Sequence, residues 1–77
     1  MMLNWTASPS QGVTGYNVYR STTSGTGYAK INSSAVGGLS YTDSTVLNST
    51  TYYYVTTSVD NSGDESSYSQ EVQMIIP

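Results

Sequence analysis

The chain has 77 residues, of which 9% are charged, and a net charge of −3, so it has room for one small domain that buries roughly 60–65% of the surface exposed by its unfolded form. Its two cations, Arg20 and Lys30, are too few for binding nucleic acid or inserting into an anionic membrane surface, and no apolar run approaches the roughly 18 residues of a membrane-spanning helix. Cysteine and histidine are absent, which excludes disulfide bonds, thiol nucleophiles and imidazole bases, so we expect no cofactor and no metal.

Alternating apolar and polar residues predict strands along the whole chain. Serine and threonine together number 25 and tyrosine numbers eight, a composition that suits a pleated, half-buried surface. Clusters of turn residues separate the predicted strands, which cover residues 3–7, 15–21, 28–32, 39–43, 51–60 and 70–76. Six strands joined by short turns predict an all-β fold, a two-sheet antiparallel β-sandwich.

The predicted core consists of the inward-facing positions of these strands. They are Leu3, Trp5, Tyr16, Val18, Tyr52, Tyr54 and Val72. Met74 and Ile76 share the inward face of the last strand. We expect Trp5 to lie between the sheets against Val18 and Tyr54.

Four stretches of the chain carry a family resemblance. They are Leu3–Ala7 with its tryptophan, Val13–Ser21, Ser40–Asp43, and Thr51–Val55 with its continuation Val59–Ser66. Together they resemble a fibronectin type III domain of the kind found in bacterial extracellular enzymes and surface proteins. The resemblance implies an immunoglobulin-like sandwich in which residues 1–77 form a single domain that begins at strand B and lacks strand A. It also implies that the Tyr52 hydroxyl bonds the backbone of the preceding corner, with Val46 packed beside it.

A sandwich without strand A leaves one side of strand B unpaired. Three explanations stay open: the chain is a fragment, the domain tolerates the loss as a monomer, or a partner chain supplies the missing strand. In the third case the assembly edge is formed by the apolar ends, Met1, Met2, Leu3, Met74, Ile75 and Ile76. Head-to-tail strand addition of this kind builds a fibre.

Carboxylates are the only candidates for acid–base chemistry. They are Asp43, Asp60, Asp64, Glu65 and Glu71. A glycosidase needs two carboxylates facing across a cleft, and we interpret these five as solvated turn residues instead. Residues 60–65 are rich in side-chain oxygen but lack the spacing of a calcium loop, so we interpret them as the turn between strands F and G.

Two tyrosines and three asparagines are candidate surface sites. Tyr19 and Tyr53 have the outward parity on neighbouring strands and could form an exposed contact pair for a polysaccharide or a protein. The alternative is that they stabilise the sheet by cross-strand packing. Asn4, Asn32 and Asn48 each begin an N-x-[ST] triplet, which is weak evidence for glycosylation.

These observations favour a domain that is not an enzyme. The leading hypothesis is a non-catalytic structural or spacer module of a secreted or cell-surface multidomain protein, with other domains of the same protein as its partners. One alternative is an extracellular fibre subunit whose partners are copies of itself. A lesser alternative is an accessory module that binds carbohydrate or protein.

Overall fold

The computed structural model describes residues 2–5, 12–32, 36–69 and 71–77, which form an all-β fold. Its strands are β1 (Met2–Asn4), β2 (Val13–Ser21), β3 (Ala29–Lys30), β4 (Ser40–Thr42), β5 (Thr51–Asp60) and β6 (Val72–Ile75). β5 has the predicted bounds, whereas β3 and β6 are shorter than predicted. Residues 6 and 7 of the first predicted strand lie outside the described residues. Within the described ranges, no helix has the length and apolar character needed to cross a membrane.

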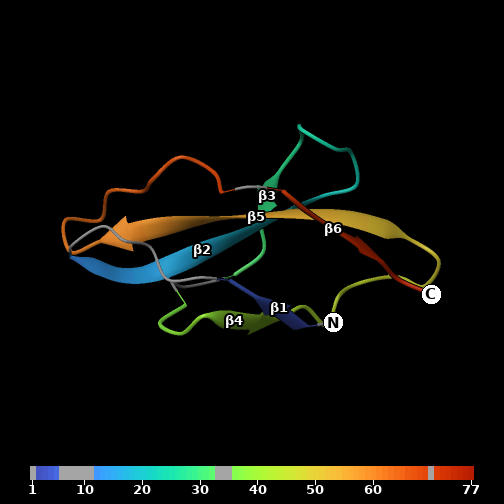
Figure 1. Cartoon of the computed structure of the whole chain (residues 1–77), viewed down its shortest axis with the longest axis horizontal. Coiled ribbons are helices and arrows are strands. Elements are labelled where there is room, and N and C mark those ends of the chain that lie inside the picture. The colour runs from blue at the N-terminus through green and yellow to red at the C-terminus, as the bar shows by residue number, and fades with distance from the viewer. Residues whose placement is uncertain (1, 6–11, 33–35, 70) are drawn as a thin grey trace.

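The strands form two antiparallel sheets, as predicted. β1 and β4 pair as a two-stranded sheet, and the larger sheet has the order β3-β2-β5-β6. The long strands β2 and β5 run side by side through the middle, with Val18 opposite Thr56, and the small sheet lies on one side of them (Figure 1). This is the arrangement of a β-sandwich with one narrow and one wide sheet.

The core lies between the two sheets. A cluster of buried side chains joins Leu3 of β1 to Val18, Tyr52 and Tyr54 of the wide sheet. Tyr16 is also buried, and its ring meets Trp5 edge to face at 5.7 Å between centroids. These five residues therefore lie where the parity of their strands places them, while Trp5 is half-buried and packs against the cluster.

The corner before β5 contains the hydrogen bond expected of Tyr52. The backbone N–H of Leu47 donates to the Tyr52 hydroxyl at 2.9 Å. Val46, next to Leu47, is partly buried against the core cluster that contains Tyr52. The tyrosine thus ties the connection between the sheets to the start of β5.

Val72 is the one predicted core residue that is largely exposed, and that prediction is wrong. Its exposed fraction is 47%, although it is paired with the buried Tyr54. Val72 borders a small cavity of about 40 Å³ together with Leu3 and Trp5. The sheet of β1 and β4 has two strands and is too narrow to cover the edge strand β6. The Val72 side chain therefore points inward, but the small sheet does not cover it.

The outer face of the wide sheet is covered as well. Val55 and Thr57 are each 3% exposed, although they alternate with the core residues of β5. The segment ahead of β6 runs along the free edge of β5, where Ser66 N–H donates to Ser58 O at 2.9 Å and Ser69 N–H to Thr56 O at 2.8 Å. Figure 1 shows this segment arching beside β5 before it enters β6. Side chains from residues 64–69 can therefore close over a face that local alternation predicts to be solvated.

Candidate functional site

Three tyrosines meet on the outer face of the wide sheet. Tyr19 comes from β2, Tyr28 from the residue before β3, and Tyr68 from the segment along β5. The rings of Tyr19 and Tyr28 each lie 5.2 Å from that of Tyr68, at interplanar angles of 67° and 63°. These edge-to-face contacts are the arrangement that the charge distribution of aromatic rings favours. Tyr68 is 51% exposed, so this tyrosine cluster (Tyr19, Tyr28 and Tyr68) presents one ring to solvent.

Glu65 connects the tyrosine cluster to β5. The hydroxyls of Tyr19 and Thr57 both donate to its Oε2 atom. These two hydrogen bonds lower the pKa of Glu65 by stabilising its charged form. The same contact with the carboxylate, with burial adding to it, raises the pKa of Tyr19 to about 12. Glu65 is therefore an ionised acceptor that holds its own segment against the sheet.

Glu71 makes a second connection, to the loop between β2 and β3. Its carboxylate accepts hydrogen bonds from the Ser24 hydroxyl at 2.6 Å and the Gly25 N–H at 2.7 Å. The Tyr28 hydroxyl donates to the same carboxylate. Hydrogen bonds from Ser24 and Tyr28 lower the pKa of Glu71. Glu65 and Glu71 thus hold the segment between β5 and β6 against the tyrosine cluster.

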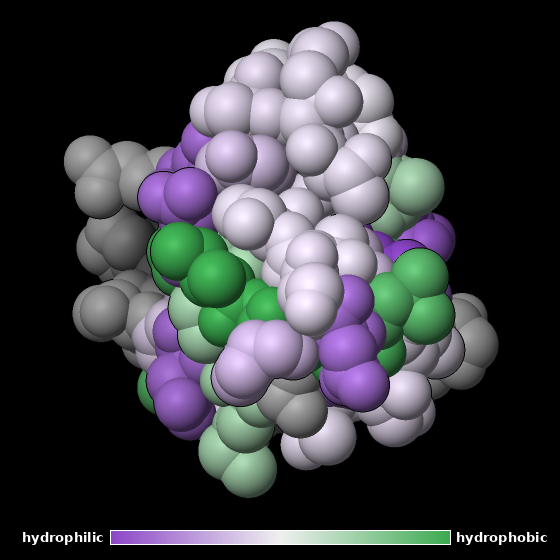
Figure 2. Space-filling model, turned by 90° about the vertical axis from the view of Figure 1, so that its right-hand side faces the viewer, coloured by the Kyte–Doolittle hydropathy of each residue, from purple (hydrophilic) through white to green (hydrophobic). Residues whose placement is uncertain are grey.

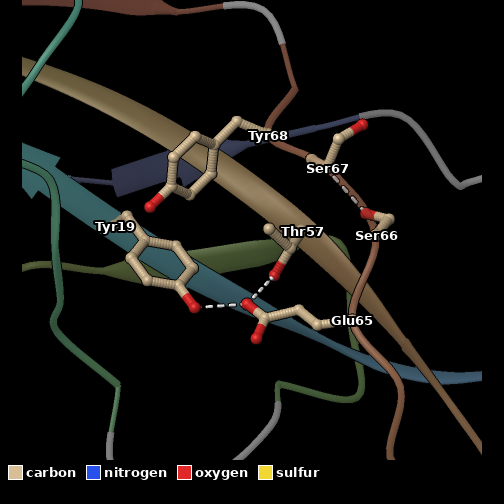
Figure 3. Close-up of a pocket in the computed structure, with 6 residues that line it drawn as sticks. All are labelled: Tyr19, Thr57, Glu65, Ser66, Ser67 and Tyr68. Carbon is tan, nitrogen blue, oxygen red and sulfur yellow. Dashed lines mark hydrogen bonds between the residues drawn. The ribbon is translucent and has the colours of Figure 1, made fainter.

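An open depression of about 420 Å³ lies beside the cluster. It is lined by Tyr19, Thr57, Glu65, Ser66, Ser67 and Tyr68. Figure 3 shows the rings of Tyr19 and Tyr68 on one side of Thr57 and the two serines on the other. The hydroxyls of Tyr19 and Thr57 bond the same oxygen of Glu65, and its second oxygen is turned away from them. Among the described residues that line the depression, Glu65 is the single acid, whereas glycoside hydrolysis uses a facing pair. The lining offers aromatic surface, hydroxyl groups and one carboxylate.

Asp43 is buried, and the expectation that it is a solvated turn residue is wrong. Its exposed fraction is 3%. Oδ2 accepts from Arg20 Nη1 at 2.9 Å and from the Tyr54 hydroxyl at 2.8 Å. Oδ1 accepts from the backbone N–H of Thr45 at 3.0 Å and from its hydroxyl at 2.7 Å. Four donors therefore surround a carboxylate that local sequence predicts at the surface.

The electrostatics of Asp43 follow from these donors. Burial acts to raise the pKa of this carboxyl, but hydrogen bonds from Thr45, Tyr54 and Arg20 outweigh it and lower the pKa to about 2. Burial and the bond to Asp43 raise the pKa of Tyr54. The guanidinium carbon of Arg20 also lies 4.8 Å from the centre of the Tyr52 ring, a cation–π contact. Every group in this network is engaged by another, so its role is to stabilise the fold.

Asn32 is buried too, which argues against glycosylation of its triplet. Its exposed fraction is 5%. Its Oδ1 accepts from the Val18 N–H at 2.8 Å, and its Nδ2 donates to Asn17 Oδ1 at 3.0 Å. Asn4 and Asn48 are exposed. Of the three asparagines, these two are therefore the ones at which the folded domain has room for a glycan.

The two tyrosines singled out in the sequence have different surroundings. Tyr19 and Tyr53 are both half-buried, and they are diagonal neighbours because Tyr19 pairs with Val55 and Tyr53 with Ser21. Tyr19 makes its ring contact with Tyr68. Sequence reasoning missed this partner because Tyr68 lies outside any strand, and the available signal was only its tyrosine identity in a serine-rich segment.

A solved structure shows the same architecture. An Fn3-like protein from Clostridium thermocellum is 41% identical and matches with a TM-score of 0.87, over 99% of this chain and 75% of that chain. This chain belongs to the Fn3-like family. The sequence-based assignment to an Fn3-like sandwich is thereby confirmed, although no protein-family model matches the chain.

Three sequence relatives of this Fn3-like domain are amylopullulanases. The protein from Thermoanaerobacter thermohydrosulfuricus is 50% identical over 75% of this chain, and that from Thermoanaerobacterium saccharolyticum is 45% identical over 87%. The protein from Thermoanaerobacterium thermosulfurigenes is 39% identical over 90% of this chain. In each case the Fn3-like domain spans only 4–5% of the relative's length. It therefore corresponds to a small region of much longer proteins.

The residues expected at an assembly edge of the Fn3-like domain are unequally exposed. Met2 and Ile75 are 60% and 72% exposed, whereas Leu3 is buried and Met74 and Ile76 are half-buried. Met1 lies outside the described residues. Figure 2 shows apolar side chains in separate patches, with polar ones between them, on the end of the molecule near the C-terminus. The relatives give no support to a fibre subunit, and strand addition at this edge stays a prediction.

Proposed function

We propose that this domain is a non-catalytic accessory module of a secreted or cell-surface multidomain protein that acts on polysaccharide. The observation that carries the proposal is the match to a small region of three amylopullulanases at 39–50% identity. A region of 4–5% of such a chain works beside other domains of the same polypeptide. Those neighbouring domains are the partners that the proposal assigns to it.

The arrangement of the carboxylates supports a non-catalytic role. Asp43 is enclosed by four donors, and Asp60 accepts the backbone N–H groups of Ser62 and Asp64 within its turn at 2.9 Å each. Glu65 and Glu71 fasten one segment to the sheet. Each of these acids has a structural task within the described part of the chain, and the charge-poor, serine- and threonine-rich composition suits an extracellular domain.

The test is to incubate the purified chain with pullulan and with amylose and to measure the release of reducing ends. We expect no release above a buffer control, while circular dichroism shows a folded β protein. Release that disappears in Glu65→Gln would overturn the proposal. Light scattering after size exclusion separates the alternatives, because a monomer over a wide concentration range fits an accessory module and a growing assembly fits the fibre subunit.

A further inference from the structure

We propose that the depression beside the tyrosine cluster binds a neutral glucan chain, with the ring of Tyr68 as its stacking surface. The proposal rests on the proposed function, because the glucan class comes from the amylopullulanase relatives. It goes beyond that function by assigning the module a ligand and a place for it. The argument proceeds from the shape of the depression, its polar groups and its charge.

The shape suits a sugar ring lying against an aromatic one. The depression is open and holds about 420 Å³, so it admits part of a polymer that continues in both directions. Tyr68 is 51% exposed, and its orientation is fixed by edge-to-face contacts with Tyr19 and Tyr28 at 5.2 Å. A ring already held in place loses little entropy when a ligand stacks on it. The apolar C–H face of a pyranose is a complementary surface for such a ring.

The depression also offers polar groups as partners for the hydroxyls at the rim of a stacked sugar ring. Glu65 Oε2 accepts hydrogen bonds from Tyr19 and Thr57, and Figure 3 shows the second oxygen turned away from these two hydroxyls. A hydrogen bond with the Asn17 side chain also lowers the pKa of Glu65. Ser66 and Ser67 line the other side. In the described part of the chain the Tyr68 hydroxyl makes none of the hydrogen bonds that fix the segment, so binding need not break the contacts that hold Tyr68 in place.

The charge selects an uncharged ligand. The depression contains the ionised Glu65 and no cationic side chain, and the chain as a whole carries −3. Of the two cations, Arg20 is engaged by Asp43 at 2.9 Å, and the charge of Lys30 acts on Glu65 and helps to lower its pKa. The carboxylate in the lining and the net charge of −3 favour a neutral polymer rich in hydroxyls over phosphate, sulfate or acidic polymers.

The experiment is affinity electrophoresis of the chain in native gels that contain pullulan, amylose or no polysaccharide. We expect both glucans to retard the wild-type chain in a concentration-dependent manner. Tyr68→Ala removes the stacking ring and should weaken the apparent affinity about tenfold or more. Tyr68→Phe keeps the ring and should stay within about twofold of wild type, as should Leu47→Ala, a surface control that is 67% exposed in the wild type.

Thermal unfolding of each variant shows whether it is folded. If Tyr68→Ala is not, Ser67→Arg takes its place, because a long side chain there fills the depression and should also abolish retardation. The proposal is overturned if the folded wild type migrates equally with and without glucan, or if the folded blocking variant, Tyr68→Ala or its replacement Ser67→Arg, binds as well as wild type. Those results leave the non-catalytic assignment intact, because that assignment is tested by the separate assay for reducing ends. Hydrolysis of pullulan by the wild type would refute the non-catalytic assignment without changing the binding result.

Discussion

Replacing Asp43 by Asn tests whether the buried carboxylate holds the sandwich together. The substitution keeps the shape of the side chain and removes its charge. The Arg20 guanidinium and the Tyr54 hydroxyl then lose a charged acceptor at 2.9 and 2.8 Å. Breaking a buried ion pair costs about 3–5 kcal/mol, and the 25% exposure of the Arg20 side chain lets water compensate in part. We expect the free energy of unfolding at pH 7 to fall by about 2–4 kcal/mol, a large share of the roughly 4–12 kcal/mol expected for a domain of this length.

The same network predicts a pH dependence with a definite sign. Folding lowers the pKa of Asp43 from 3.8 to about 2, so the folded state favours the charged form. The stabilisation is fully present above the unfolded pKa and is lost as the pH falls from about 4 to about 2. The difference between the two pKa values corresponds to about 2–3 kcal/mol. The gap in stability between wild type and Asp43→Asn should therefore narrow as the pH falls through this window.

Urea unfolding followed by the fluorescence of the single tryptophan measures both effects. Asp64→Asn is the matched control, because the same chemical change occurs at an exposed turn residue, and it should alter the free energy of unfolding by less than about 0.5 kcal/mol. A variant Asp43→Asn that matches this control at pH 7 would refute the reasoning. So would a gap of equal size at pH 7 and at pH 2.5.

Three further substitutions probe single contacts. Tyr52→Phe should lower the free energy of unfolding by about 1 kcal/mol, because the Leu47 N–H loses its acceptor at 2.9 Å; an unchanged urea midpoint would contradict the corner bond. Asn32→Ala should lower the free energy of unfolding by about 2–3 kcal/mol, because it leaves the Val18 N–H unpaired. Mass spectrometry of the wild type from a glycosylating host should find no glycan on Asn32, and a glycan there would contradict the argument from burial. Trp5→Ala should cost about 2–4 kcal/mol, measured by circular dichroism, and a small change would place Trp5 outside the core.

Local patterns predicted the parts of this fold that depend on local chemistry. The alternation in residues 51–60 fixed both the ends of β5 and the inward direction of Tyr52 and Tyr54, because side-chain direction in a strand has a period of two residues. The hydrogen bond of Tyr52 to the preceding corner was expected from the family resemblance, and its donor, the Leu47 N–H, lies five residues away in the chain.

Features that depend on distant partners were not predictable in this way. The burial of Asp43 requires Arg20, 23 residues earlier in the chain, and nothing near Asp43 in the sequence reveals that pairing. Thr57 has the outward parity and is buried because residues 64–69 fold back along β5. The candidate site fell in the same category: Tyr19 was noticed, but Tyr68 and Glu65 reach it from 49 and 46 residues away.

The strand directions affect how this domain can be strung into a longer polypeptide. β1 begins and β6 ends toward the same end of the longest axis (Figure 1), which measures 39 Å against 21 and 20 Å for the others. A polypeptide that enters at β1 and leaves after β6 therefore reverses its direction, and the domain projects to one side of it. The domain lies in line only where residues ahead of β1 first run the length of the sandwich, which takes roughly 12 residues at about 3.3 Å each. The path of the chain ahead of β1 thus decides whether this domain separates its neighbours or leaves them close together.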